Sequence, residues 1–431
     1  MLLAWTLSAF AARPDAVAFV DGSGHPIRCH HLEGQAALCG VVLAALDEAW
    51  SVQVDGLGFA APLPDGGLGG SDALDVYLAH DGTGGAGGAY VICEGDEADP
   101  CVDAVAGDGR ASTPTYIVID PDTPAADLRG YAHHEFNHVC QYATDFEEPF
   151  LAVWEGTAVA AEHWTDPTAP LDPGPIADYQ VTPWASAVLQ DGYWLDETYG
   201  IWSWYEYGAT VWVRWMDERH GDGAGSLGPA LWQAFANDPG ENEPDVLDAW
   251  DTLGGDWRTD LPDFVRMRAR LGTDTQPEWA KSLGVGARIP WEDGATGRVD
   301  GEWNASHELF PLGAVFARFE HDGNALSATL ADAESFVLVD LDAPDGTPAA
   351  DHLEFSEAGT VHFAMVSVPG DGFDADDALT GATATLLFGE PSDCGCASAG
   401  PGVPWGVLLS VSGAGAAARA RPGRRGLATG R

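Results

Sequence analysis

The sequence predicts an α+β fold in which a small sheet and a set of helices are followed by a β-rich unit. Short β-type runs occur before residue 120, helical spacing of apolar residues fills the middle of the chain, and alternating runs return after about residue 286. At 431 residues the chain is also long enough for two folded units. We expect an α+β domain over 13–285 and a β-sandwich over 286–390, flanked by terminal segments 1–12 and 391–431.

The first part of the chain combines one helix with three strands. Apolar residues recur at helical spacing over 33–50, which predicts an amphipathic helix. The runs 74–79, 89–93 and 115–120 have β-type composition and are separated by Gly- and Asp-rich loops. These segments indicate a helix packed against a small sheet.

The middle of the chain has helical periodicity. A first helix is expected over 125–143, and further helices are expected over 155–164, 206–220, 226–238 and 259–270. Beyond residue 286, alternation predicts strands over 314–319, 336–341, 360–368 and 382–388. Closely spaced strands with turn residues between them are typical of a β-sandwich.

Acidic residues far outnumber basic ones, with Asp+Glu 67 against Lys+Arg 19 and a net charge of -48. Nucleic acid is bound by clustered cations, so this composition excludes it as a partner. A polyanionic surface stays soluble where counter-ions screen its charges, which favours saline surroundings. Alternatively, acidic loops solvate the fold or bind structural calcium; the aspartates concerned are Asp65, Asp72, Asp75, Asp81, Asp371, Asp374, Asp376 and Asp377.

The spacing of the cysteines predicts two local disulfides. Cys29 with Cys39 and Cys93 with Cys101 bracket short loops, and pairs this close in an exported protein often form disulfides. Cys140 falls within the expected helix over 125–143, where a buried thiol and a thiolate ligand are both open interpretations.

Residues 134–138 form the pattern His-Glu-x-x-His. Residues four apart on a helix share one face, about 6 Å apart along the axis, so the imidazoles of His134 and His138 can bind one Zn(II). Glu135, beside the first histidine, can take a proton from the metal-activated water as it attacks a carbonyl. His133 has no histidine four residues further on, and we expect it outside the ligand set. The alternative is that these histidines only cap or solvate an ordinary helix.

Catalytic zinc needs a third protein ligand and an open position. The metzincin spacing would require Gly at 141 and His at 144, but the chain has Gln141 and Thr144. Residues 153–158, Val-Trp-Glu-Gly-Thr-Ala, resemble the W-E-G-x-A helix of gluzincins. This resemblance implies Glu155 as the third ligand. Glu162, two turns along the same helix, is its rival, and the role expected for it is a hydrogen bond to a ligand histidine.

Residues 204–208, Trp-Tyr-Glu-Tyr-Gly, resemble the P-Y-E-K-G segment that carries the transition-state tyrosine in the aminopeptidase branch of gluzincins. The resemblance implies that Tyr205 stabilises the oxyanion. The other candidates for this role are Tyr207, Tyr193 and His163. An aromatic core is the competing interpretation of Trp202, Trp204, Tyr205 and Trp212.

Residues from roughly 20 to 240 are similar to secreted metalloproteases of myxobacteria. The resemblance implies the two-subdomain plan of zincins, with the metal-motif helix between a sheet-bearing half and a helical half. In zincins an edge strand pairs with extended substrate, and the run 115–120 precedes the motif helix. No G-x-M-E-N exopeptidase motif is present, so we expect an endopeptidase acting on protein or peptide substrates. A catalytically silent surface or adhesion protein on the same scaffold is the alternative.

Both ends of the chain predict a secreted or cell-surface protein. Residues 2–11 form an apolar run that ends in Ala-Phe-Ala, as at a signal-peptidase site, so 1–12 is the expected signal peptide. At the other end, Cys394 and Cys396 precede a modest apolar stretch and several arginines, an order that resembles the myxobacterial C-terminal sorting signal. The resemblance implies that 391–431 attaches the protein, expected as a monomer, to the cell surface; a low-complexity tail is the alternative.

Overall fold

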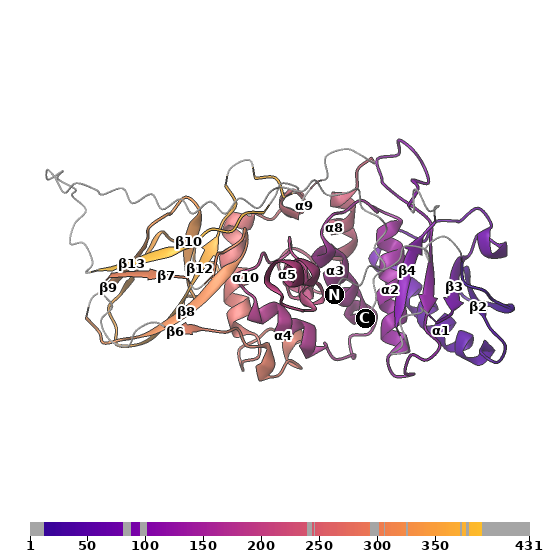
Figure 1. The fold of residues 1–431 in the computed structure, drawn as a ribbon, viewed down its shortest axis with the longest axis horizontal. Helices are drawn as coiled ribbons and strands as arrows, with labels where there is room; N and C mark the ends of the chain where they lie inside the picture. Colours follow the sequence, from indigo (N-terminus) through magenta and orange to yellow (C-terminus); the bar gives the residue numbers. More distant parts are fainter. Residues whose placement is uncertain are drawn as a thin grey trace.

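The computed structural model describes residues 13–80, 88–94, 101–238, 244, 246–293, 301–305, 307–324, 326–370, 373–375 and 379–389. The predicted signal peptide and tail lie outside these residues, as do Asp81, Asp371, Asp376 and Asp377. Within them the chain combines helices with several sheets, which confirms the α+β class. Figure 1 shows a first sheet at one end, helices in the middle and further strands at the other end.

The first sheet has the strand order β1-β2-β3-β5-β4. The inner strands β2 (Ile27–His31), β3 (Leu74–Leu78) and β5 (Thr115–Ile119) are parallel, and β1 (Ala18–Asp21) and β4 (Ala89–Cys93) are antiparallel to their neighbours. The three predicted strands are confirmed. β1 and β2 are additional, because polar residues in β2 conceal its alternation. The expectation that the run 115–120 is an edge strand is wrong, because β4 lies beyond β5.

The helix predicted over 33–50 is confirmed as α1 (Ala36–Ala49), which continues as a π-helix over Trp50–Leu57. Among the described residues this is the one continuous helix long and apolar enough to cross a membrane. Its residues Val42 and Leu46 are fully buried, and it packs against β2 and the next helix. The apolar side of this helix is therefore part of the core.

Both predicted disulfides are present, and they anchor the first sheet. One joins Cys29 of β2 to Cys39 of α1. The other joins Cys93 at the end of β4 to Cys101. Cys140 is a free, buried thiol, and burial raises its pKa well above the usual value. A protonated thiol is a poor metal ligand, which favours the packing interpretation of Cys140.

Helices form the middle of the molecule. They are α2 (Leu128–Tyr142), α3 (Leu151–Thr165), α4 (Pro173–Val181), α5 (Gly192–Tyr199), α6 (Tyr205–Gly208), α7 (Thr210–His220), α8 (Leu227–Phe235), α9 (Val246–Thr252) and α10 (Trp257–Arg270). Single 3-10 turns occur at Leu68–Gly70, Glu278–Ala280 and Val285–Ala287. The predicted helices correspond to α2, α3, α6 with α7, α8 and α10. The helices α4, α5 and α9 are additional. Each has nine residues or fewer, and α4 contains two prolines and a glycine, so the sequence signal for a helix is weak there.

Two four-stranded sheets follow the helices, in the orders β10-β12-β8-β6 and β11-β9-β13-β7. Their strands are β6 (Glu292–Asp293), β7 (Gly301–Asn304), β8 (Ala314–His321), β9 (Leu326–Leu330), β10 (Phe336–Asp340), β11 (His352–Phe355), β12 (Gly359–Ser367) and β13 (Thr385–Gly389). Side chains of both sheets, such as Phe319 and Leu386, share one buried core. This is the face-to-face packing of a β-sandwich, and β8, β10, β12 and β13 correspond to the predicted strands.

Helix α10 joins the helical part to the sandwich (Figure 1). The buried Arg266 donates from Nε to the carbonyl of Asp340 in β10 at 2.9 Å and from Nη1 to Asp263 at 2.8 Å. The core of the helical part continues onto the sandwich through Phe316 and Val366. The two parts therefore share apolar packing as well as hydrogen bonds.

Candidate metal centre

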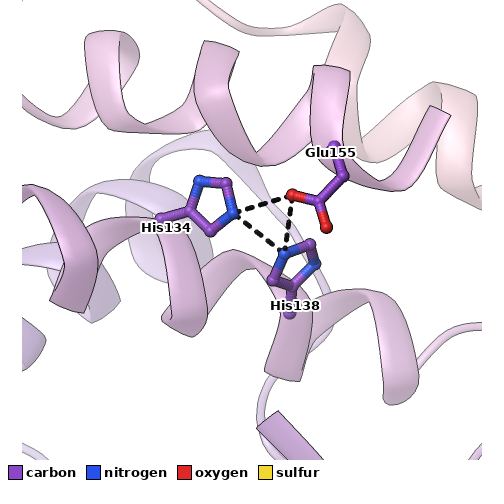
Figure 2. Close-up of side chains that lie close together, drawn as sticks. All are labelled: His134, His138 and Glu155. Carbon is purple, nitrogen blue, oxygen red and sulfur yellow. Dashed lines mark hydrogen bonds and ion pairs between the residues drawn. The ribbon is translucent and has the colours of Figure 1, made fainter. Parts of the chain in front are cut away.

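Helices α2 and α3 bring His134, His138 and Glu155 together (Figure 2). Glu155 Oε2 lies 3.0 Å from His134 Nε2 and 3.5 Å from His138 Nε2, and the two Nε2 atoms are 3.0 Å apart. All three side chains are buried. The two histidines share a helix face because they are four residues apart, whereas Glu155 reaches them only through the packing of α3 on α2.

This geometry fits a single zinc ion. Three donors bound about 2.1 Å from one tetrahedral ion lie about 3.4 Å apart. The three separations in this group, from 3.0 to 3.5 Å, are close to that value. Two imidazoles and one carboxylate are also a common ligand set of catalytic zinc, which leaves a fourth position for water or substrate.

The second ring nitrogens of both histidines have oriented partners. His134 Nδ1 lies 2.7 Å from Glu162 Oε1, and His138 Nδ1 lies 2.6 Å from Gln141 Oε1. Partners of this kind fix the tautomer that leaves Nε2 free to bind a metal. Glu155 and Glu162 therefore meet opposite nitrogens of the His134 ring. Gln141 is a partner that the sequence analysis did not identify, although its spacing of three from His138 was a usable signal.

The charges of this group favour a cation. Burial lowers the pKa of His134, but hydrogen bonds to Glu155 and Glu162 outweigh burial and raise it. Burial also disfavours the ionised form of Glu155, yet His138 and His134 hold the pKa of this carboxyl well below its usual range. Glu155 is therefore anionic at neutral pH and suited to bind a metal.

Glu135 and His133 flank the first histidine on α2. Glu135 is 4% exposed, so its carboxylate is in a site that is almost closed to bulk water. His133 Nε2 lies 3.4 Å from Glu48, and His133 does not belong to the group around Glu155.

Buried amide side chains hold the helices of this site in place. Asn137 Nδ2 donates to Gln53 at 3.1 Å, and Gln141 Nε2 donates to Asn137 Oδ1 and to the carbonyl of Trp154, both at 3.0 Å. Gln53 also donates to the carbonyl of His133 at 3.0 Å. The network thus connects the π-helix, α2 and α3. No local pattern reveals it, because its partners are as much as 84 residues apart.

Tyr205 does not lie in position for the expected oxyanion role. Its side chain is fully buried, its hydroxyl donates to the carbonyl of Ser186 at 2.8 Å, and its ring packs on Tyr179. The physical reason is that α6 turns Tyr205 into the core. Tyr207, two residues further on, instead stacks on His134 with ring centroids 5.9 Å apart. Of the tyrosines in this segment, Tyr207 is the one in ring contact with the metal group.

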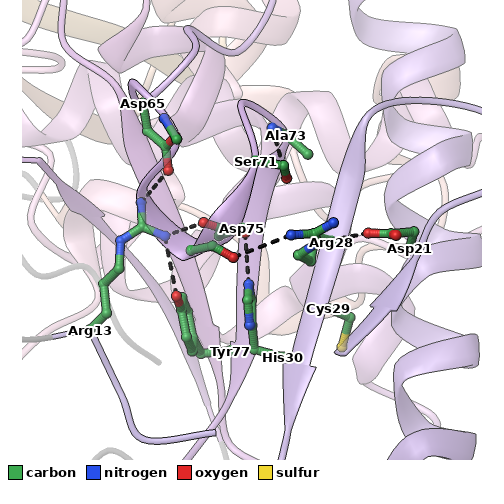
Figure 3. A network of polar contacts seen from close by, with 12 residues as sticks. Arg13, Asp21, Arg28, Cys29, His30, Asp65, Ser71, Ala73, Asp75 and Tyr77 are labelled. Carbon is green, nitrogen blue, oxygen red and sulfur yellow. Dashed lines mark hydrogen bonds and ion pairs between the residues drawn. The ribbon is translucent and has the colours of Figure 1, made fainter. Parts of the chain in front are cut away.

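Only some of the aspartates considered for calcium lie in the described part of the chain. Two of these, Asp65 and Asp75, are paired with the side chain of an arginine. Figure 3 shows Arg13 paired with Asp65 and Asp75, and Asp75 2.8 Å from His30 Nε2. Arg13 also forms an ion pair with Glu94. These contacts occupy the carboxylates of Asp65 and Asp75 and argue against calcium at both.

The fold and the site together define an α+β protein with a buried His-His-Glu group on two packed helices. Comparison with protein-family models finds no match to the chain. Comparison with curated proteins finds none either. Function is therefore argued from the geometry of the site.

Proposed function

We propose that this protein is a zinc endopeptidase with a zincin-type catalytic domain, secreted or held at the cell surface. The observation that carries the proposal is the convergence of His134 Nε2, His138 Nε2 and Glu155 Oε2 beside the buried Glu135. A general base next to an open three-ligand zinc site is the combination that peptide hydrolysis requires.

His134, His138 and Glu155 would hold the ion. When bound, zinc supplies Lewis acidity that lowers the pKa of a coordinated water and polarises a substrate carbonyl. Glu135 accepts the proton that the attacking water loses and transfers it to the leaving amine. Glu162 and Gln141 orient the two imidazoles, so their contribution is to metal affinity and not to proton transfer.

The sheet offers a place for an extended substrate. β4 is the last strand at its end of the first sheet, and α2 packs against it. An exposed strand edge can add one further strand by main-chain hydrogen bonds. A peptide bound along β4 would therefore run beside the helix that carries Glu135.

Export is supported by the disulfides Cys29–Cys39 and Cys93–Cys101. Structural disulfides persist in oxidising compartments and are rare in the cytosol. A net charge of -48 also suits a protein that works in salt-containing surroundings.

The test compares the wild type with Glu135→Gln. We expect both to bind one zinc ion per chain, measured by atomic absorption, because Glu135 is not a ligand. Cleavage of casein should fall at least about 100-fold in the variant, since it loses the general base. Zinc binding with no cleavage that depends on Glu135 would contradict the peptidase and favour the silent surface protein. A chain that binds no zinc would contradict the metal site itself.

A further inference from the structure

Three aromatic rings lead from the protein surface to the candidate metal centre. Trp202 and Trp204 are in edge contact with centroids 5.7 Å apart, and Trp204 and Tyr207 are in edge contact at 5.6 Å. Tyr207 in turn stacks on His134. We call Trp202, Trp204 and Tyr207 the aromatic row. Each ring contacts the next, so the aromatic row connects the protein surface to the metal group.

The aromatic row is open at its outer end. Trp202 is 65% exposed, Trp204 is partly exposed and Tyr207 is buried. Trp212, in contrast, is only 1% exposed, so the interpretation of these rings as one core cluster holds for Trp212 and not for Trp202. Trp202 therefore has an uncovered aromatic surface that a ligand can contact.

The surroundings of the aromatic row favour a positive ligand. The chain from Trp164 to Val213 contains aspartates and glutamates but no Lys, Arg or His. Asp178 lies against the row, because its Oδ2 accepts the backbone N–H of Trp204 at 2.9 Å. A cation near an aromatic face gains from the ring quadrupole, and neighbouring carboxylates add to this attraction.

A second exposed aromatic residue, Tyr193, lies in the field of other acidic side chains. Tyr193, in the first turn of α5, is 56% exposed. Burial and the charges of Glu206, Glu155 and Asp191 raise the pKa of its hydroxyl. Tyr193 therefore lies within electrostatic range of the glutamate of the metal group.

We propose that the aromatic row binds the cationic side chain of an arginine or lysine in the peptide substrate. The proposal rests on the proposed peptidase function and names its substrate class as basic peptides. The guanidinium or ammonium group would lie on Trp202, with the carboxylate of Asp178 nearby. The overall charge of -48 would attract the same peptides from solution.

Binding is tested without turnover, in zinc-loaded Glu135→Gln at 0.15 M salt. The probes are fluorescein-labelled, blocked nonapeptides of alanine and glycine in which one residue, moved along the peptide, is arginine or citrulline. Citrulline has the shape of arginine without its charge. We expect the best arginine peptide to bind about 10-fold more tightly than its citrulline counterpart, measured by fluorescence anisotropy.

Trp202→Ala, made in the Glu135→Gln background, should remove this preference, while Trp202→Tyr should keep part of it because a π face remains. Phe19→Ala is the matched control. Phe19 is also exposed, at 52%, but lies in β1 at the far edge of the first sheet. General attraction to an acidic protein would survive all three substitutions. Equal binding of arginine and citrulline peptides, or a preference that survives Trp202→Ala, would overturn the proposal.

Peptide binding and casein cleavage together distinguish a failure of this proposal from a failure of the proposed peptidase function. If wild type cleaves casein but Glu135→Gln shows no preference that depends on Trp202, the peptidase stands and the proposed binding surface fails. If the preference is present but no peptide or casein is cleaved, the binding surface is supported and the peptidase fails.

Discussion

Glu155 and Glu162 show how one helix supplies two carboxylates for different tasks. They are seven residues apart and therefore share a face of α3. Their oxygens nevertheless meet opposite nitrogens of the His134 ring, 3.0 Å from Nε2 for Glu155 and 2.7 Å from Nδ1 for Glu162. Only the nitrogen that also faces His138 can share a metal with it, which assigns the ligand role to Glu155 in our proposal.

Substitution of these glutamates by glutamine should separate their roles. Glu162→Gln loses a charged partner of His134, and zinc affinity should fall about 10- to 100-fold. Glu155→Gln loses an anionic ligand and should weaken zinc binding more than that. Dissociation constants can be measured by competition with a chromogenic chelator. A larger loss for Glu162→Gln would reverse the assignment.

Asp145 is a buried carboxyl between α2 and α3. It is fully buried, and its Oδ1 accepts the backbone N–H of Glu147 at 2.9 Å. No hydrogen-bond donor of the described chain reaches Oδ2. Burial, with a smaller contribution from the charge of Glu147, raises the pKa of Asp145 from 3.8 to about 7. The folded protein therefore retains a proton here that the unfolded chain has already lost.

Stability should consequently fall as the pH rises from 5 to 7. The native state binds the proton up to its raised pKa of about 7, whereas the unfolded carboxyl is ionised above about pH 4. This difference removes about 2 kcal/mol of unfolding free energy between pH 5 and 7. Asp145→Asn cannot ionise, so urea unfolding should show a shallower decline over this window. Parallel pH profiles of variant and wild type would show that Asp145 does not titrate in this way.

At the scale of elements, the contact of α3 with the α6–α7 junction depends on a glycine, Gly156, which has no side chain. A Cβ added to Gly156 would lie 3.0 Å from the carbonyl carbon of Ala209 and 3.1 Å from the nitrogen of Thr210. Both are backbone atoms, which cannot rotate away. The glycine after Glu155 therefore lets the helix that carries this glutamate approach the segment that carries Tyr207.

Gly156→Ala should destabilise the protein by about 1–3 kcal/mol, because overpacking outweighs the better helix propensity of alanine. Gly40→Ala is the matched control. Gly40 also lies within a helix, but it is exposed and a Cβ there would meet open space. That variant should be stabilised by up to about 1 kcal/mol. Urea unfolding measures both, and stabilisation of both variants would contradict the close approach at Gly156.

At the scale of the whole molecule, the negative charge of the chain opposes folding. Asp+Glu 67 against Lys+Arg 19 places many carboxylates on the same surface, and their mutual repulsion opposes the compact state. The repulsion acts over a Debye length of about 10 Å in 0.1 M salt and about 3 Å in 1 M salt. Counter-ions should therefore stabilise the fold.

The midpoint of thermal unfolding at pH 7 should rise on the order of 5 °C between 0.05 and 1 M NaCl. Differential scanning calorimetry provides the measurement. Near pH 4 about half of the carboxyl groups are protonated, so the same salt step should have a smaller effect. An unfolding temperature that falls with salt at pH 7 would mean that attractive ion pairs, such as those of Arg13, dominate instead.

Much of the fold follows from local patterns in the sequence. Several features depend only on residues that are near one another in the chain. They are the spacing of His134 and His138, the long helices, most of the predicted strands and the two disulfides. Periodicity determines the helices, the strands and the histidine pair because a helix or strand places neighbours at fixed offsets. The disulfides follow from the short sequence separation of the paired cysteines. Elements that are short or polar, such as β2, α4 and α5, carry too little periodicity to be predicted.

Tertiary packing alone decided the rest of the candidate site. The sequence determined that two histidines share a helix face and that Glu155 and Glu162 are the competing acids. Which glutamate meets which nitrogen of His134 depends on how α3 crosses α2. Packing also decides that Tyr207, and not the predicted Tyr205, lies beside His134. It likewise decides that β4, and not β5, is the edge strand of the first sheet. These contacts join distant segments, whose relative placement depends on the packing of whole elements and not on any local offset.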